Sequence, residues 1–324
     1  MNFMKKKQSA ILLAILLVTP VLNLLEAQDR SSNPFVTHMY TADPSAHVWD
    51  DGRLYVYPST DLPKRGYAKM DGYHVFSTDD MVTWTDHGEI LNSGDVEWGR
   101  EEGGFMWAPD CAYRNGVYYY YFPHPSGSSY KETWKIGVAT STSPTSGFEE
   151  QGYIKGLLPL IDPCVFIDDD DQAYLFHGNP NKPYGVKLKE NMVEIDGEPQ
   201  PLEGLDNFKE GLWVFKRNNI YYAIYPDFKK PYNEMHYAMS DNPLGPFDHK
   251  GVFLEGTGVI TTHGSIVEYK GQWYLFYHNG ALSGGMASNR SICFDKVSFN
   301  EDGTINMVEQ TLGNVCGGST ENGE

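Results

Sequence analysis

The amino-acid sequence predicts an all-β fold arranged as a five-bladed β-propeller. Three observations favour it: a turn-and-strand pattern that recurs five times, a composition rich in aromatic and turn-forming residues, and the lack of a 3.6-residue apolar period. Of the 324 residues, 14% are aromatic, 22 are tyrosines, and Gly and Pro number 33 and 19. Such a composition is typical of many short strands joined by turns. A large β-sandwich is the alternative, which the regular repeat disfavours.

The first 27 residues have the pattern of a secretory signal peptide. Three lysines at 5–7 precede an apolar run at 11–25, and Ala27 supplies a small residue for cleavage. The alternative is a membrane anchor, for which a run of this length containing a proline is short. We therefore expect cleavage and export to the periplasm or the exterior of a bacterial cell.

The repeated pattern is a turn pair followed by alternating aromatic and aliphatic residues. Its five copies occupy residues 51–58, 115–122, 170–177, 218–225 and 270–277. Asp-Gly and Asn-Gly pairs, as at Asp51-Gly52 and Asn115-Gly116, are strong signals for a hairpin. Each copy is therefore predicted to be the second strand of a hairpin.

The segments around each copy complete the predicted blades. First strands are expected at residues 42–49, 106–113, 160–167, 210–216 and 263–269, and third strands at 73–78, 135–140, 236–240 and 291–294. The turns at positions 52, 116, 171, 219 and 271 are 64, 55, 48 and 52 residues apart. Five units of three to four strands read as one propeller domain over 28–316, followed by a flexible tail at 317–324.

The net charge of the chain excludes some classes of binding partner. The chain has 25 basic and 43 acidic residues, a net charge of −18. This argues against nucleic acid and against an anionic membrane surface, both of which require Lys and Arg. After the leader, no stretch is long and apolar enough to span a bilayer. The four cysteines fit no metal-binding spacing, and Cys111 and Cys164 are expected to be buried thiols.

Counting back from each turn brings five residues to one end of the predicted channel, because the first strand of a blade lies nearest the axis. Nine residues before the first four turns and eight before the fifth stand Asp43, Trp107, Asp162, Glu210 and His263. Converging carboxyls acquire separated pKa values, which acid–base chemistry at one bond needs. Taken singly, an Asp-Pro step is ordinarily a turn and a Glu-Gly step a loop. It is the matched placement that favours a site.

For two residues and one acidic run, the sequence leaves a structural role open beside a functional one. A structural role for His263 is as plausible as a metal-binding or substrate-binding one. Trp107 suits either channel packing or stacking on a sugar ring. The acidic run at 168–171 lacks the spacing of a calcium-binding loop and reads as a solvated turn.

In several motifs taken together, the chain resembles glycoside hydrolase family 43 from Asn33 to about Asn314. The matching motifs are Ala42-Asp43-Pro44, Met106-Trp-Ala-Pro-Asp110, Ile161-Asp162-Pro163, Glu210-Gly211 with Trp213, His263-Gly264-Ser265, and Arg290. They are specific together and weak singly. The chain departs from the family pattern in the Gly-Leu-Trp that follows Glu210, and we expect neither the extra β-sandwich of many xylosidases nor a carbohydrate-binding module.

The resemblance implies roles for the carboxyls. Asp43 would be the general base, Glu210 the general acid, and Asp162 the residue that orients Glu210 and tunes its pKa. The family hydrolyses with inversion, which requires the two catalytic carboxyls to be about 6.5–9.5 Å apart.

Further roles follow from the same resemblance. Trp107, Trp213 and Arg290 would bind substrate, and Arg290 matches an arginine that contacts either substrate or the pKa-tuning Asp. No cofactor is required. Family members often hold calcium or another ion in the channel, for which His263 is the candidate ligand, through water.

The expected function is that of an exported, monomeric glycosidase acting on arabinose- and xylose-containing oligo- or polysaccharides. An exo-acting α-L-arabinofuranosidase or β-xylosidase is the first expectation. Endo-acting arabinanase or xylanase activity, or exo-galactanase activity on the same fold, is the alternative. A non-catalytic sugar-binding propeller is the alternative from another class, and the presence of all three carboxyls argues against it.

Overall fold

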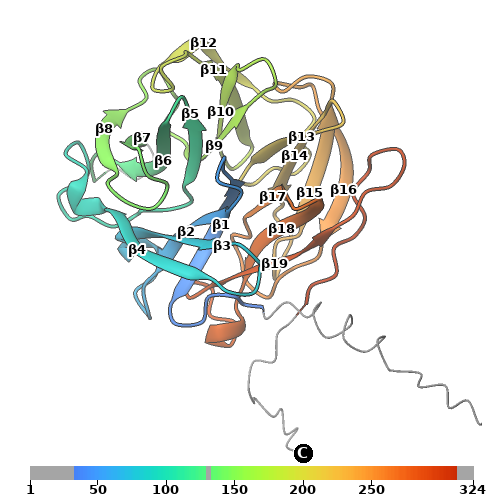
Figure 1. Ribbon diagram of the computed structural model, residues 1–324, viewed down its shortest axis with the longest axis horizontal. Helices are drawn as coiled ribbons and strands as arrows, with labels where there is room; N and C mark the ends of the chain where they lie inside the picture. The colour runs from blue at the N-terminus through green and yellow to red at the C-terminus, as the bar shows by residue number, and fades with distance from the viewer. Residues whose placement is uncertain (1–32, 129–132, 312–324) are drawn as a thin grey trace, which may run out of the picture. The chain divides into compact units, whose positions relative to one another are not determined.

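The computed structural model describes residues 33–128 and 133–311, and these form five β-sheets around a central axis (Figure 1). The predicted all-β, five-bladed propeller is confirmed. The expected signal peptide at 1–27, the tail at 317–324 and Cys316 lie outside the described residues. None of the helices within the described ranges is long and apolar enough to cross a membrane.

Each blade is an antiparallel sheet of consecutive strands. Blade 1 contains β1 (Tyr40–Val48), β2 (Leu54–Asp61), β3 (Gly72–Thr78) and β4 (Thr85–Asn92); blade 2 contains β5 (Asp110–Arg114), β6 (Val117–Pro125), β7 (Trp134–Ser141) and β8 (Glu149–Tyr153). Blade 3 contains β9 (Ile161–Ile167), β10 (Ala173–Asn179), β11 (Lys182–Leu188) and β12 (Ile195–Pro201). Blade 4 contains β13 (Trp213–Arg217), β14 (Ile220–Pro226), β15 (Met235–Ser240) and β16 (Asp248–Leu254); blade 5 contains β17 (Gly264–Tyr269), β18 (Gln272–Asn279) and β19 (Ser291–Val297).

The first strand of every blade lies nearest the axis, as predicted (Figure 1). Two of these strands start later than expected: β5 begins at Asp110 and β13 at Trp213, because residues 106–109 and 210–212 leave the ladder to form loops at the channel. Strand β6 extends as far as Pro125.

The aromatic second strands form the packing between blades. Tyr57, Tyr120, Tyr222 and Tyr277 are each fully buried on a second strand. Apolar clusters join each sheet to its neighbours, and the cluster containing Val36, Phe276 and Phe294 joins blade 5 to blade 1. The ring closes where the start of the described chain lies along β19, with Phe35 N donating to Ile292 O at 3.3 Å. Cys111 and Cys164 are buried thiols, as predicted.

Candidate active site

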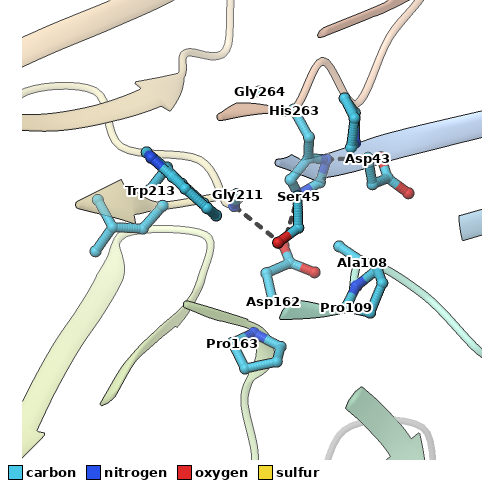
Figure 2. A pocket seen from close by; sticks show the side chains of 12 residues that line it. Asp43, Ser45, Ala108, Pro109, Asp162, Pro163, Gly211, Trp213, His263 and Gly264 are labelled. Carbon is cyan, nitrogen blue, oxygen red and sulfur yellow. Dashed lines mark hydrogen bonds and ion pairs between the residues drawn. The ribbon is translucent and has the colours of Figure 1, made fainter. Parts of the chain in front are cut away.

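Two cavities meet at the centre of the propeller. The smaller has a volume of about 20 Å³, room for one water-sized particle, and residues at the start of all five blades line it (Figure 2). The larger has a volume of about 320 Å³, within the range of ligand pockets. It is lined by Asp43, Tyr67, Met70, Trp107, Ala108, Ile161, Asp162, Asn179, Pro180, Glu210, Thr261, His263 and Arg290. Four of these residues line both cavities, so the smaller one continues the larger into the channel.

Bulges in two of the first strands set which residues reach the axis. At Asp43-Pro44 and Asp162-Pro163 the first strand carries one residue more than its partner strand. Both aspartates have a positive φ, 50° and 58°, which Asp tolerates better than most residues. The matched position therefore lies nine residues before the turn in blades 1 and 3 but eight in the others. The matched set is Asp43, Ala108, Asp162, Gly211 and His263.

This register corrects the count made from the sequence. Trp107 and Glu210 do not occupy the matched position but lie one residue earlier, since blades 2 and 4 lack a bulge in the first strand. Both nevertheless line the larger cavity together with Asp43, Asp162 and His263. The five predicted residues therefore do gather at one cavity.

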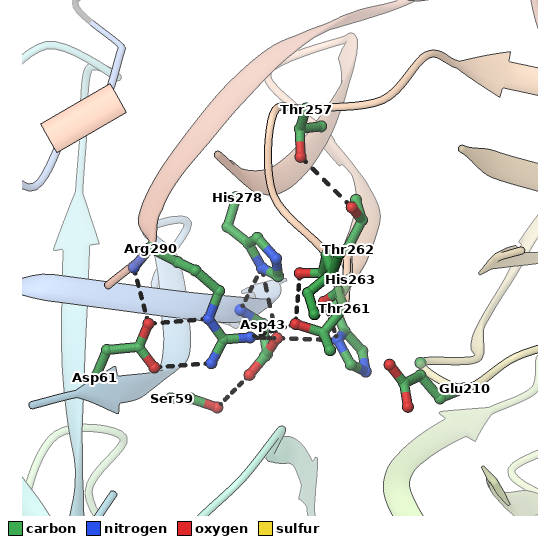
Figure 3. A network of polar contacts seen from close by, with 12 residues as sticks. Asp43, Ser59, Asp61, Glu210, Thr257, Thr261, Thr262, His263, His278 and Arg290 are labelled. Carbon is green, nitrogen blue, oxygen red and sulfur yellow. Dashed lines mark hydrogen bonds and ion pairs between the residues drawn. The ribbon is translucent and has the colours of Figure 1, made fainter. Parts of the chain in front are cut away.

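Asp43 is a buried carboxylate fixed by charged and polar partners. Its Oδ1 accepts from Arg290 Nη1 at 2.8 Å and lies 2.9 Å from His263 Nδ1, and its Oδ2 accepts from Ser59 Oγ at 2.7 Å (Figure 3). Burial alone would raise the pKa of Asp43, but the positive charges of Arg290 and His263 outweigh it and hold the pKa well below its ordinary value. Asp43 is therefore ionised throughout the neutral range.

Arg290 is the structural partner of Asp43. The guanidinium is 2% exposed and also donates from Nε and Nη2 to the two oxygens of Asp61, at 2.9 and 2.8 Å. The resemblance predicted contact with substrate or with Asp162. The structure instead pairs Arg290 with Asp43 and Asp61, although Arg290 does line the larger cavity.

His263 lies between two carboxylates. Its Nδ1 is 2.9 Å from Asp43 Oδ1 and its Nε2 is 3.0 Å from Asp162 Oδ2. Burial lowers the pKa of His263, but the negative charges of Asp43 and Asp162 outweigh this and raise the pKa well above its ordinary value. His263 is therefore an imidazolium at neutral pH, and a protonated ring has no lone pair for a metal.

The free energy of unfolding should depend on pH because His263 is protonated in the folded state. Because the folded pKa of His263 lies above the ordinary value of 6.5, its contribution is complete below pH 6.5 and is lost as the pH rises through the folded pKa. We expect the free energy of unfolding to fall between pH 6.5 and the folded pKa of His263, by up to about 1.4 kcal/mol per pH unit. Urea unfolding at several pH values, for the wild type and His263→Gln, measures this slope, and equal slopes in the two proteins would contradict the assignment.

Asp162 connects His263 to the backbone beside Glu210. Its Oδ2 accepts from Gly211 N at 3.0 Å, as Figure 2 shows, and contacts His263. Burial raises the pKa of the Asp162 carboxyl; the charge on His263 opposes this, and the nearby carboxyls of Glu210 and Asp43 add to it. The contact with Gly211 gives Asp162 a direct means of orienting Glu210.

Glu210 lies in the loop before β13, half-buried on the wall of the larger cavity. Its Oε1 is 3.1 Å from Lys209 Nζ but makes no hydrogen bond. Lys209 is itself held by Asn233, whose Oδ1 accepts from Nζ at 2.9 Å. Figure 3 draws Glu210 on the other side of His263 from Asp43. The site therefore presents one carboxyl free of hydrogen-bond partners at Oε1 and a second that is held ionised.

The two predicted tryptophans have different positions. Trp107 is half-buried on the wall of the larger cavity, with Nε1 donating to Tyr67 O at 2.9 Å. Trp213, predicted to bind substrate, instead lines the smaller cavity, where it packs on His47 at 5.2 Å between ring centroids and donates to Ile266 O. Trp213 is a channel residue because it belongs to β13, three residues beyond Glu210.

Position 211 requires glycine for two reasons: its backbone conformation and the close approach of His263. Its φ is +63°, and a Cβ there would lie 2.2 Å from His263 Cδ2. We expect Gly211→Ala to lower the free energy of unfolding by about 1–3 kcal/mol and to displace the imidazole, with loss of activity. Gly116→Ala is the control, since its φ is +84° and nothing lies within 4 Å of the added Cβ. Thermal melts and rate assays of both variants test this, and equal behaviour would contradict it.

Several residues of the site had not been predicted from the sequence. These are Asp61, Lys209, His278, Tyr67 and Thr261. His278 accepts from Asp43 N through Nδ1 at 3.1 Å, and burial lowers its pKa, consistent with a neutral ring. Lys209 precedes a predicted site residue, and Asp61 ends β2 three residues beyond the predicted strand, but neither carries a motif of its own.

Comparison with known proteins adds to this geometry. A family model described as "Glycosyl hydrolases family 43" matches residues 31–305. A xylosidase/arabinosidase of Humicola insolens is 35% identical, with 84% of this chain and 98% of that protein covered. A xylosidase/arabinosidase of Bacteroides ovatus is 34% identical, with 83% and 95% covered.

Solved structures agree with the sequence comparison. A β-xylosidase/α-arabinofuranosidase from a compost microbial metagenome, in a calcium-free complex with xylotriose, is 34% identical with a TM-score of 0.78, covering 86% of this chain and 97% of that one. A Xanthomonas citri enzyme complexed with xylotriose is 36% identical with a TM-score of 0.77, covering 86% and 94%. The similarity thus extends over the whole propeller.

Proposed function

Because the chain belongs to glycosyl hydrolase family 43 and is a glycosidase, we propose that it removes terminal β-D-xylose or α-L-arabinofuranose units from xylan- and arabinose-containing polysaccharides. The observation that carries this proposal is the placement of Glu210 and Asp43, from different blades, on one cavity with Trp107 on its wall. The xylosidase/arabinosidase names of two relatives support the choice of sugars.

The proposed reaction is a single displacement by water. Glu210 donates its proton to the glycosidic oxygen as the bond from that oxygen to the anomeric carbon breaks. Water attacks the same carbon from the opposite face and gives its proton to Asp43, so the configuration inverts. The transition state has oxocarbenium character, and the negative charge of Asp43, secured by Arg290 and His263, also stabilises it.

The remaining residues position this pair. Asp162 holds the amide of Gly211 and thereby the backbone that carries Glu210. Arg290 fixes Asp43 through a guanidinium that Asp61 holds in place. Trp107 offers the half-buried aromatic ring on which a sugar can stack.

The test of the function uses aryl β-D-xyloside, aryl α-L-arabinofuranoside, xylotriose, arabinan, xylan and galactan. We expect the wild type to release monosaccharide from the aryl glycosides and from chain ends, and NMR to show α-xylose as the first product from a β-xyloside. First release of β-xylose would overturn the inverting mechanism. Wild-type protein as inert as Glu210→Gln on every substrate would support a non-catalytic sugar-binding propeller instead.

A calcium ion in the smaller cavity is part of this proposal. The carboxylate oxygens of Asp43 and Asp162, the donor type that calcium prefers, converge there beside the imidazole of His263, and the cavity admits a single small particle. The fit holds only when His263 has lost its proton. The ion would supply positive charge between Asp43 and Asp162, as the imidazolium does. We expect calcium binding to release a proton, which calorimetry in buffers of different ionisation enthalpy measures; no buffer dependence would contradict it.

Export is proposed from the sequence alone. Residues 1–27 have the features of a cleaved leader, and we expect the mature protein to begin after Ala27. Sequencing the N-terminus of protein recovered from the native host tests this. We also expect the mature protein to be a monomer in gel filtration.

A further inference from the structure

A second cluster of ligand-type side chains lies in blade 4, outside both cavities. Asp227 follows β14, Glu234 precedes β15, and His236 is the second residue of β15. One ligand atom from each lies within 4.8 Å of the other two. Asp227 and His236 are buried and Glu234 is half-buried. Since none of the three lines either central cavity, the proposed glycosidase mechanism does not use them.

The imidazole of His236 has a buried nitrogen with no hydrogen bond. The residue is 8% exposed, and its Nε2 makes no hydrogen bond although Asp227 Oδ2 is 3.3 Å away. Its other nitrogen, Nδ1, is 2.8 Å from His249 Nε2. A buried polar atom without a partner is costly, so this nitrogen points to a missing ligand.

Counting protons along the chain of contacts supports this. Three polar contacts lie in a row, and each needs one proton between its two atoms. They join Asp227 to His236, His236 to His249, and His249 Nδ1 to Asp206 Oδ2, the last at 3.6 Å. Two neutral imidazoles carry only two protons for these three contacts. The contact between the two rings, at 2.8 Å, takes one proton, so in one of the other two contacts a nitrogen lone pair faces a carboxylate.

We propose that Asp227, Glu234 and His236 Nε2 bind one divalent transition-metal ion of the zinc type. Three protein ligands of mixed nitrogen and oxygen donors, with water as the fourth, match the coordination that zinc accepts in proteins, whereas calcium prefers oxygen ligands alone. The ion fills the gap between Asp227 and His236. This inference does not depend on the proposed sugar chemistry.

Lys229 is the competitor for this ion. Its ammonium pairs with Glu234 Oε1, and its side chain is 54% exposed. An exposed lysine can leave the carboxylate at little cost, because surface ion pairs are weak. Removing its charge therefore favours the metal.

The site lies in a segment that reaches the catalytic cavity. Asn233 Nδ2 donates to Asp227 O at 2.8 Å, and Asn233 Oδ1 accepts from Lys209 Nζ and from Thr261 N, at 2.9 and 2.7 Å. A metal joining Asp227 to Glu234 would tie together the two ends of the segment that carries Asn233. We therefore expect zinc to raise the melting temperature.

The experiment uses the full chain, stripped with a chelator and titrated with Zn²⁺. We expect the wild type to bind one equivalent more than His236→Gln and Glu234→Gln, by calorimetry and by elemental analysis after dialysis. Zinc should raise the melting temperature of the wild type but not of these variants. We expect Lys229→Met to bind the additional equivalent about fivefold more tightly, since a competing positive charge is gone. The matched control is His249→Gln, which should keep the equivalent because His249 Nε2 contacts Nδ1 of His236, not the ligand atom Nε2, and His249 is not itself a ligand.

Crystals soaked in zinc locate the ion by its anomalous signal. A peak between the three side chains is expected. Equal stoichiometry in the wild type and Glu234→Gln overturns the proposal, and so does a peak that has no matching equivalent in solution. If His236→Gln fails to fold, the half-buried Glu234→Gln decides alone. Zinc bound at the channel residues is common to all the variants and cancels in the difference.

Discussion

Replacing Glu210 with glutamine is expected to reduce kcat on xylotriose by roughly 10²–10⁴-fold. Glutamine has the shape of the acid but has no acidic proton to transfer to the leaving oxygen. Glu210 is half-buried and its Oε1 makes no hydrogen bond, so the substitution should leave the free energy of unfolding close to that of the wild type. Steady-state kinetics and a thermal melt on the same preparation measure both quantities.

The leaving group separates acid catalysis from a structural role for Glu210. An aryl glycoside with a strongly acidic phenol needs no proton to depart, whereas a sugar leaving group does. The loss in Glu210→Gln should therefore be largest with xylotriose and small with a dinitrophenyl xyloside. A loss of the same size on both substrates would contradict the role of Glu210 as general acid.

The blades were predictable from the sequence because their second strands, buried on both faces, are runs of aromatic and aliphatic residues that follow a turn pair. The tyrosines of β2, β6 and β14 pack between sheets, and the turn pairs that precede them are local signals. In blade 3, β11 was not predicted, since its residues Lys182–Leu188 show neither the aromatic alternation nor a turn pair. What was predictable thus depended on local patterns of burial and turn chemistry.

The exact register at the channel was not predictable by counting from the turns. A bulge adds one residue to β1 and one to β9, and no composition pattern reveals it. The proline that follows Asp43, Ala108 and Asp162 would have been a better guide, because a residue before proline avoids helical backbone and proline cannot donate to the ladder. Aligning these prolines places Ala108, rather than Trp107, at the position equivalent to Asp43.

The contacts that set the charges of the site join residues far apart in the chain. Arg290 and Asp61 are 229 residues apart, and His263 and Asp162 are 101 apart. Only closure of the ring brings them together. The sequence could therefore suggest which carboxyls carry the chemistry, but not that an arginine and an imidazolium hold Asp43 ionised.

Replacing Asp43 with asparagine is expected to lower kcat by roughly 10²–10⁴-fold on every substrate, whatever the leaving group, because an amide cannot accept the proton of the attacking water. The substitution also removes one negative partner from Arg290 and His263, so some loss of stability should accompany it. Asp61→Asn is the matched control. It weakens the hold on Arg290 in the same way but changes a residue that does not line the cavity. We expect similar melting temperatures for the two variants and a far smaller rate loss for Asp61→Asn.

A rescue experiment distinguishes a base from a residue that only supports the fold. Azide needs no base to attack carbon, and Asp43→Ala leaves room for a small anion beside Arg290. Added azide should therefore restore turnover of an aryl β-xyloside by Asp43→Ala and yield the α-xylosyl azide, with inversion, while leaving Glu210→Gln unchanged on xylotriose. If azide fails to restore turnover although the variant is folded, or yields the β-azide, then Asp43 does not act as the base facing the attacking water. The pair of variants thus tests each half of the reaction on its own: the leaving group reports on Glu210, and the nucleophile reports on Asp43.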